Sequence, residues 1–140
     1  MKLRIKKLHE DAKLPVYANP GDAGMDLFSR EDYILKAGER YTFKIGIVME
    51  IPEGHYGSVR DKSGLASKFG LTTQAGVVDA SYRGEIGIVL YNSSKEDYKI
   101  NKGDKIAQMV IQPIINPEIE EISELSETRR GDGGFGSTGR

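Results

Sequence analysis

The sequence predicts an all-β fold that is a sandwich, a jelly roll or a barrel. Apolar residues occur in short runs rich in β-branched side chains, which is typical of strands. Turn-forming residues separate these runs at short intervals, as at 19–22, 37–39, 52–54, 83–84 and 101–104. Many short strands with such regular turns are the basis of the prediction.

The clearest apolar runs predict strands at 3–8, 41–51, 86–91 and 106–114. Residues 75–87 predict a hairpin, with apolar arms on either side of 79–82. One short helix is predicted at 63–69, with Ser63 as its N-cap. Acidic and apolar residues mix at 117–128, and this spacing fits a helix or an edge strand equally well.

A chain of 140 residues is near the usual size of a single domain. A domain of this length buries about 68% of its unfolded surface, which leaves little room for a deep cleft within one subunit. We therefore expect a partner subunit to help build any site. The 20 basic and 21 acidic residues give a formal net charge of −1, which argues against a nucleic-acid partner.

The chain contains no cysteine, which excludes disulfide frameworks, thiol nucleophiles and Cys-ligated zinc or iron–sulfur sites. The charged N-terminal residues are not followed by the apolar segment of a signal peptide. No apolar run has the length of a membrane span. We therefore expect a cytoplasmic protein with no membrane partner.

The end of the chain is rich in glycine, with five in the last ten residues. This composition predicts a flexible tail at 129–140 after a β domain at 1–128. The run 131–136 matches G-x-G-x-x-G, but it opens no helix, as a dinucleotide-binding motif must. A plain disordered terminus is the alternative. Phe135 argues against it, because a lone ring among glycines suggests stacking on a flat partner.

Three central segments carry polar side chains with chemical potential. Residues 58–68 gather cations and hydroxyls around Gly64, and they fit either a phosphate cradle or a solvated basic turn. Asp79 directly follows two valines and is either a functional carboxylate or one that stabilises a turn. Asp22 and Asp26 each fit a hydrated Mg²⁺ or the cap of a bend. No single segment decides the function.

Five motifs are much more specific when they are taken together and in order. They are AGMDL at 23–27, KSGLA at 62–66, GVVD at 76–79 with YRGE at 82–85, GDKIAQ at 103–108 and RGDGGFGSTG at 130–139. They resemble the five motifs of the trimeric dUTP pyrophosphatases (dUTPases), over nearly the whole chain. The resemblance implies a jelly-roll-like β fold with a short helix, dUTP as the substrate, and a homotrimer with sites at subunit interfaces.

The resemblance also implies roles at the reacting centre. Asp79 is similar to the general base that activates a water for attack on the α-phosphorus of dUTP, which yields dUMP and pyrophosphate. Tyr82 resembles the ring that lies against the deoxyribose and excludes a 2′-hydroxyl. The hairpin positions whose main-chain groups read uracil are matched by Gly76, Val78 and Gly87.

Further roles concern the triphosphate. Ser63 and Gly64 resemble the phosphate loop, and Gln108 resembles the amide that steadies the phosphate side. Asp26 is similar to the carboxylate that orients waters on Mg²⁺, a metal held mainly by the triphosphate itself. Phe135 is expected to stack on uracil and Arg130 to contact phosphate. The other tail residues expected at the substrate are Gly136, Ser137 and Thr138.

Two positions depart from the family pattern. Lys62 stands where the family usually has Arg, and Arg60 lies two residues earlier, so either cation is a candidate for the phosphate contact. Lys62 keeps the charge but lacks the bidentate guanidinium fork. Thr73 stands where many bacterial members have Asn, as if the backbone alone reads uracil.

Two other functions stay open on the sequence alone. A dCTP deaminase, or a bifunctional deaminase that also cleaves dUTP, shares the fold but resembles its own relatives in a different hairpin motif with a catalytic Glu. A dUTP-sensing regulatory protein is the non-enzyme alternative, and the acidic stretch at 118–127 motivates it.

Overall fold

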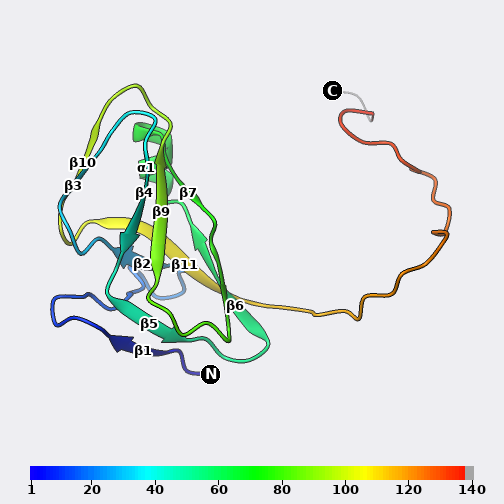
Figure 1. Cartoon of the computed structure of the whole chain (residues 1–140), viewed down its shortest axis with the longest axis horizontal. Coiled ribbons are helices and arrows are strands. Elements are labelled where there is room, and N and C mark those ends of the chain that lie inside the picture. Colours follow the sequence, from blue (N-terminus) through cyan, green and yellow to red (C-terminus); the bar gives the residue numbers. More distant parts are fainter. Residues whose placement is uncertain (138–140) are drawn as a thin grey trace.

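The computed structural model of the chain describes residues 1–137 and confirms a mostly β fold with one short helix (Figure 1). The elements in chain order are β1 (Arg4–Lys7), β2 (Met25–Phe28), β3 (Tyr33–Leu35), β4 (Arg40–Lys44), β5 (Ile47–Glu50), β6 (His55–Arg60), α1 (Ser63–Phe69), β7 (Leu71–Gln74), β8 (Val77–Asp79), β9 (Gly87–Asn92), β10 (Tyr98–Ile100) and β11 (Lys105–Pro113). The helix predicted at 63–69 is therefore confirmed.

Two antiparallel sheets form the body of the molecule. One has four strands in the order β2-β11-β6-β8, and the other has three in the order β4-β9-β7. Buried residues alternate with half-buried ones along β9, as expected for a sheet with one face on a core. Leu27 and Met109 of the first sheet and Phe43 and Leu90 of the second belong to one buried apolar cluster.

The predicted hairpin at 75–87 is wrong, because its two arms enter different sheets. β8 pairs with β6, whereas β9 pairs with β4 and β7. The chain changes sheets at Ala75 and Gly76, whose φ angles of 61° and 111° lie outside the range of a strand. β8 consequently forms the edge of its sheet, and one side of its backbone has no strand partner among residues 1–137.

Two smaller predictions also differ from the structure. The run at 41–51 is two strands, because Gly46 between them adopts a φ of 76° that a continuous strand does not allow. Lys62, not Ser63, is the N-cap of α1, and it makes no side-chain capping bond. The helix ends at Gly70 in the left-handed conformation, as glycine at this position commonly allows.

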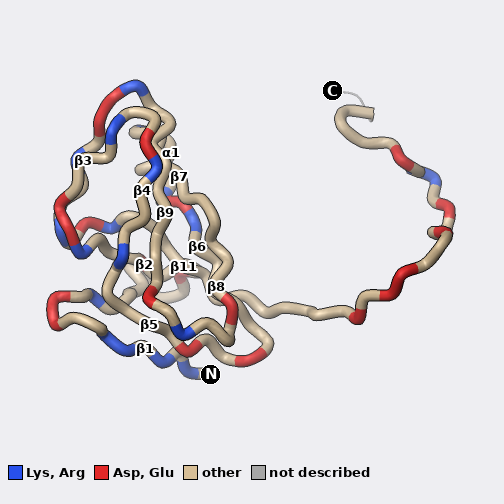
Figure 2. The backbone as a smooth tube through the Cα atoms, viewed as in Figure 1, with Lys and Arg blue, Asp and Glu red and all other residues tan. Residues whose placement is uncertain are grey.

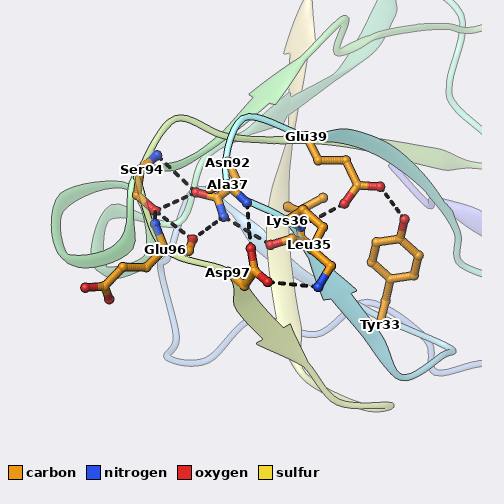
Figure 3. A network of polar contacts seen from close by, with 9 residues as sticks. All are labelled: Tyr33, Leu35, Lys36, Ala37, Glu39, Asn92, Ser94, Glu96 and Asp97. Carbon is orange, nitrogen blue, oxygen red and sulfur yellow. Dashed lines mark hydrogen bonds and ion pairs between the residues drawn. The ribbon is translucent and has the colours of Figure 1, made fainter.

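Asn92, which is fully buried at the end of β9, organises the turns at one end of the body (Figure 3). Its Nδ2 donates to the carbonyl oxygens of Leu35 and Glu96 at 3.1 and 2.8 Å. Its Oδ1 accepts from the backbone N–H and the hydroxyl of Ser94. Asp97 continues the network to the turn after β3 by accepting from the backbone N–H of Ala37 at 3.0 Å. These bonds hold together the turns after β3 and β9.

The chain leaves the body after β11 and runs outward as a tail (Figure 1). Residues 117–128 form neither the helix nor the edge strand that the sequence allowed. Ile115, Ile119 and Leu125 are almost fully exposed there, and acidic residues recur along the same stretch (Figure 2). Among the described residues no helix combines the length and the apolar character that a membrane span requires.

Candidate active site

A cavity of about 240 Å³ brings five predicted site residues together. We call it the Asp79 pocket, and its predicted members are Gly76, Val78, Asp79, Tyr82 and Gly87. They come from β8, from the residue before it, from the turn after it and from the start of β9, although the two strands are not paired with each other. The structure therefore gathers the residues predicted to read the base around the predicted general base.

Asp79 is the last residue of β8 and lies exposed at the pocket. Its carbonyl oxygen accepts a hydrogen bond from the backbone N–H of Tyr82 at 3.1 Å, which forms a turn. Arg83 closes the same turn, because its guanidinium donates to the carbonyl oxygens of Ala80 and Tyr82 at 2.6 and 3.0 Å. Backbone groups and Arg83 hold the turn. Within residues 1–137 the Asp79 carboxylate makes no hydrogen bond, so it is available to a ligand.

Glycine is required at two positions beside the pocket. A Cβ on Gly84 would lie 2.3 Å from the hydroxyl oxygen of Tyr82, so only glycine lets this ring lie across the backbone. The Tyr82 hydroxyl donates to the carbonyl oxygen of Glu85 at 3.1 Å and so fixes the ring. Gly76 has a φ of 111°, and a Cβ there would lie 2.9 Å from the carbonyl oxygen of Val59. Backbone geometry therefore shapes the pocket.

A second group of predicted residues surrounds the buried carboxylate of Asp26. Only 2% of Asp26 is exposed, and its two oxygens face the ammonium groups of Lys62 and Lys105. The distance from Lys105 Nζ to Asp26 Oδ2 is 2.7 Å. Burial raises the pKa of Asp26, but the ammonium groups of Lys105 and Lys62 outweigh it and hold the pKa below its usual value. We call these three residues the Asp26 cluster.

Gln108 fixes the backbone that leads to the predicted phosphate loop. Its Nε2 donates to the carbonyl oxygen of Asp61 at 2.8 Å. A Cβ on Gly24 would lie 2.3 Å from Gln108 Oε1, so glycine in the first motif makes room for this amide. The carboxylate of Asp61 accepts from both the backbone N–H and the hydroxyl of Thr73, each at 2.6 Å. Thr73 thus serves the loop that precedes α1.

Ser63 and Gly64 lie exposed in the first turn of α1. The Ser63 hydroxyl has no hydrogen-bond partner among the residues described, which leaves it available to a ligand. A Cβ on Gly64 would meet nothing within 4 Å, although glycine in a helix costs about 1 kcal/mol relative to alanine. Packing within the chain gives no reason for this glycine, and close approach of a ligand would give one.

Asp79 and the phosphate loop lie toward opposite ends of β6. Asp79 pairs with Tyr56 near the start of this strand, whereas the loop at 61–64 begins where the strand ends at Arg60. At a rise of about 3.3 Å per residue, Tyr56 and Arg60 are roughly 13 Å apart. Asp79 and the loop that begins α1 are therefore separated along β6.

The tail residues lie apart from both groups (Figure 1). Arg130 Nε donates to the carbonyl oxygen of Gly133 at 2.7 Å, so the tail forms a local turn of its own. The Phe135 ring is fully exposed, and Gly136 and Ser137 are exposed beside it. Thr138, the last predicted tail residue, lies outside the described residues.

Comparison with known proteins identifies the family. The dUTPase family model matches residues 10–139. The chain belongs to the dUTPase family. A deoxyuridine 5'-triphosphate nucleotidohydrolase of Clostridium tetani is 54% identical over 140 residues, which are 99% of this chain and 97% of that protein.

Solved dUTPase structures have the same fold. A Staphylococcus bacteriophage 80alpha dUTPase with dUpNHpp superposes with a TM-score of 0.92 at 34% identity, covering 99% of both chains. A dUTPase from phage phi11 of S. aureus, in which a structural Mg(II) ion is coordinated, superposes with a TM-score of 0.84 at 32% identity. It covers 91% of this chain and 100% of that one. The jelly-roll-like fold of the dUTPase family is thereby confirmed.

The residues described do not form a metal cage of the chain's own. No group of three or more His, Cys, Asp or Glu side chains converges within residues 1–137. Asp26, predicted to orient metal-bound waters, directs both oxygens at lysines. The described donor set therefore does not fit a Mg²⁺ ion held by the protein, and the role of Asp26 through water stays a prediction.

Two features of this dUTPase site escaped the sequence analysis. Lys105 lies inside the fourth motif, but only the structure brings it to Asp26. The register of β11 on β2 shifts between Lys105 and Ala107, and such a shift leaves no reliable mark in the sequence. The contact of Asp61 with Thr73 joins β7 to the loop before α1, a pairing that spacing alone does not reveal.

Proposed function

We propose that the protein hydrolyses dUTP to dUMP and pyrophosphate. The observation that carries this proposal is the Asp79 pocket, where an exposed carboxylate stands beside the backbone of an edge strand and a half-exposed tyrosine ring. Membership of the dUTPase family, and relatives named for dUTP hydrolysis, support the same reaction.

Asp79 acts as the general base. Its carboxylate takes a proton from a water molecule, and the water oxygen forms a bond to the α-phosphorus. The bond from this phosphorus to the oxygen that bridges to the β-phosphate breaks, and pyrophosphate leaves with the electron pair. Water reaches Asp79 readily because the carboxylate is exposed and no other side chain of the turn engages it.

Backbone groups of the Asp79 pocket read the uracil ring. Uracil offers N3–H as a donor and O4 as an acceptor, and cytosine reverses this pattern. The free edge of β8 carries N–H and C=O groups in fixed positions, and a cytosine there would leave buried polar groups unpaired. Tyr82 packs against the deoxyribose and excludes a 2′-hydroxyl. Gly84 leaves room for its ring, and the hydrogen bond to the carbonyl oxygen of Glu85 fixes the ring there.

The triphosphate binds at the loop that precedes and begins α1. Ser63 and Gly64 approach it with a hydroxyl and an open backbone, Lys62 or Arg60 supplies positive charge, and Gln108 steadies the loop through Asp61. Arg130, Phe135, Gly136, Ser137 and Thr138 reach the substrate when the tail closes, with Phe135 on uracil. Mg²⁺ bound to the triphosphate would neutralise part of its charge.

The active enzyme is a homotrimer with its sites between subunits. The separation of Asp79 from the phosphate loop along β6 supports this proposal, since a second copy can bring its own loop to Asp79 at one phosphate chain. Val77 beside Asp79 is 70% exposed in the single chain, as expected of a residue that a partner covers. The cytoplasmic location expected from the sequence stays a prediction.

Incubation of the purified protein with dUTP and Mg²⁺ tests the proposed reaction. We expect equal amounts of dUMP and pyrophosphate, and much slower cleavage of dCTP, dTTP and UTP. Ammonia release from dCTP would instead identify the deaminase alternative. Light scattering during gel filtration would measure the mass, and a monomer with full activity would contradict the shared site.

A further inference from the structure

Asp26 contacts two ammonium groups, which is one positive charge more than its carboxylate neutralises. Lys62 from the N-cap of α1 and Lys105 from the start of β11 each place an ammonium group on one of its two oxygens. Asp26 is 2% exposed, whereas 28% of the Lys62 side chain and 47% of the Lys105 side chain are exposed. The cluster is thus a buried carboxylate beneath two ammonium groups that solvent can reach, with a net charge of +1.

No neighbouring acid removes this excess charge. Asp61 next to Lys62 accepts two hydrogen bonds from Thr73. Asp104 next to Lys105 accepts from the backbone N–H of Asn101 at 2.8 Å. Both acids therefore hold backbone turns, and neither forms an ion pair with either lysine within residues 1–137.

The position of the excess charge matches the place where a polyanion is proposed to bind. Lys62 directly precedes Ser63 of the phosphate loop. Lys105 contacts the same carboxylate as Lys62, so it also lies near this loop. Asp26 keeps both ammonium groups close together, although they repel each other, and this arrangement is costly unless an anion binds them. Two adjacent ammonium groups suit the successive phosphates of one chain.

We propose that Lys105 is a further triphosphate-binding residue, and that Asp26 is the positioning residue that holds Lys62 and Lys105 ready for the β- and γ-phosphates. This inference rests on the proposed function, since it assumes that a nucleoside triphosphate binds at the phosphate loop. Lys62 lacks the guanidinium group of the arginine that the family usually has at this position. Two lysines held by the Asp26 carboxylate instead present two adjacent cations, which a single lysine cannot do.

Binding measurements without metal test the proposal. Calorimetry in EDTA gives the dissociation constants of dUMP and of the analogue dUpNHpp for the wild type, for Lys105→Gln and for Lys105→Arg. We expect Lys105→Gln to weaken dUpNHpp binding by about tenfold or more while dUMP binding changes little, and Lys105→Arg to stay near the wild type. Lys99→Gln, an exposed lysine on β10, is the matched control and should change neither constant.

A second pair of variants separates phosphate binding from neutralisation of Asp26. Lys105→Gln in an Asp26→Asn background leaves no buried charge to neutralise, so these proteins also serve if the single variant fails to fold. The carboxamide oxygen of Asn at position 26 still accepts a hydrogen bond from Lys105, so the proposal expects the double variant to bind dUpNHpp several-fold more weakly than Asp26→Asn alone.

Equal affinities of these two proteins would overturn the proposal, because Lys105 would then serve only Asp26. Equal loss of dUMP and dUpNHpp binding in Lys105→Gln would overturn it as well. A wild type that binds neither nucleotide would refute the proposed function itself, which is a different result.

Discussion

The Asp79 pocket is formed mainly by the backbone, whereas the Asp26 cluster is formed by charged side chains. Main-chain geometry shapes the Asp79 pocket: Gly76 and Gly84 let the backbone and the Tyr82 ring pack closely, and hydrogen bonds within the turn hold Asp79 at its rim. Charged side chains from three separate elements form the Asp26 cluster, where a buried carboxylate anchors two lysines. The first region has a fixed shape, and the second has an excess of positive charge.

This difference matches the two halves of a nucleotide. A base and a sugar are distinguished by shape and by a fixed hydrogen-bond pattern, which backbone groups provide without side-chain freedom. A triphosphate is recognised mainly by charge, which lysines provide. We therefore expect the Asp79 pocket to be sensitive to added atoms and the Asp26 cluster to changes of charge.

The largest effect is expected at the one side chain of the Asp79 pocket that takes part in the chemistry. Asp79→Asn should lower kcat by about 10²–10⁴-fold and leave the affinity for dUpNHpp nearly unchanged, because it removes the base and keeps the shape. Steady-state kinetics and calorimetry measure the two quantities. Glu53→Gln, an exposed carboxylate in the turn before β6, is the control, and an unchanged kcat in Asp79→Asn would refute the role of Asp79.

Removal of the tail tests whether the two regions suffice without it. Deletion of 129–140 should leave the thermal unfolding temperature almost unchanged, because residues 129–137 bury no part of the core. Turnover should fall on the order of 10²-fold, since the substrate would be less well positioned. Loss of the folded state would mean that the tail is structural.

Two glycines allow a matched test of shape against ligand approach. Gly76→Ala should destabilise the fold by about 1–3 kcal/mol, because its φ of 111° and the nearby Val59 carbonyl oxygen leave no room for a Cβ. Gly64→Ala should keep or raise stability, since its Cβ meets nothing within 4 Å, yet it should weaken dUpNHpp binding. Denaturant unfolding measures the stability of both variants, and calorimetry measures their affinity for dUpNHpp. A Gly64→Ala protein with wild-type affinity would show that the triphosphate does not bind at Gly64.

The smallest effect is expected on the pH dependence of the free energy of unfolding in acid. The pKa of Asp26 is lowered in the folded chain, so the ionised carboxylate stabilises the fold above its ordinary pKa, and this contribution is lost as the pH falls below about 4. In Asp26→Asn the free energy of unfolding should therefore depend less steeply on pH in this acid range. Asp97→Asn, which alters an exposed ion pair with Lys36, should change the slope less. If the free energy of unfolding depended equally on pH in the wild type, Asp26→Asn and Asp97→Asn, the ion pairs of the Asp26 cluster would not stabilise the fold.

Much of the fold followed from local patterns in the sequence. The strands β1, β9 and β11 and the helix α1 came from apolar runs and from turn residues, which act over a few neighbours. The arms of the expected hairpin were recognised as apolar, but β8 pairs with β6 whereas β9 pairs with β4 and β7. Pairing with strands that are distant in the sequence thus decided a topology that the hydrophobic pattern left open.

The candidate site was predictable in its members and less so in its connections. Asp79, Gly76, Val78, Tyr82 and Gly87 were named from the motifs, and one cavity contains them all. Lys105 was missed because its partner Asp26 lies on another strand, and the role of Thr73 was missed because its partner Asp61 lies on another element. Contacts between distant segments depend on the packed structure, which local patterns do not encode.

Complementation between two inactive variants tests most directly whether the site is shared between copies of the chain. Asp79→Asn removes the base, and Ser63→Asp places a negative charge at the phosphate loop in an exposed first turn of α1, where an acidic residue is well tolerated. The two variants are unfolded together and refolded as a mixture, and dUTP hydrolysis is measured. If Asp79 and Ser63 of different copies meet at one substrate, the mixed oligomers regain a substantial fraction of the wild-type rate, while each variant alone stays inactive. A mixture of oligomers that remains inactive would contradict the shared site.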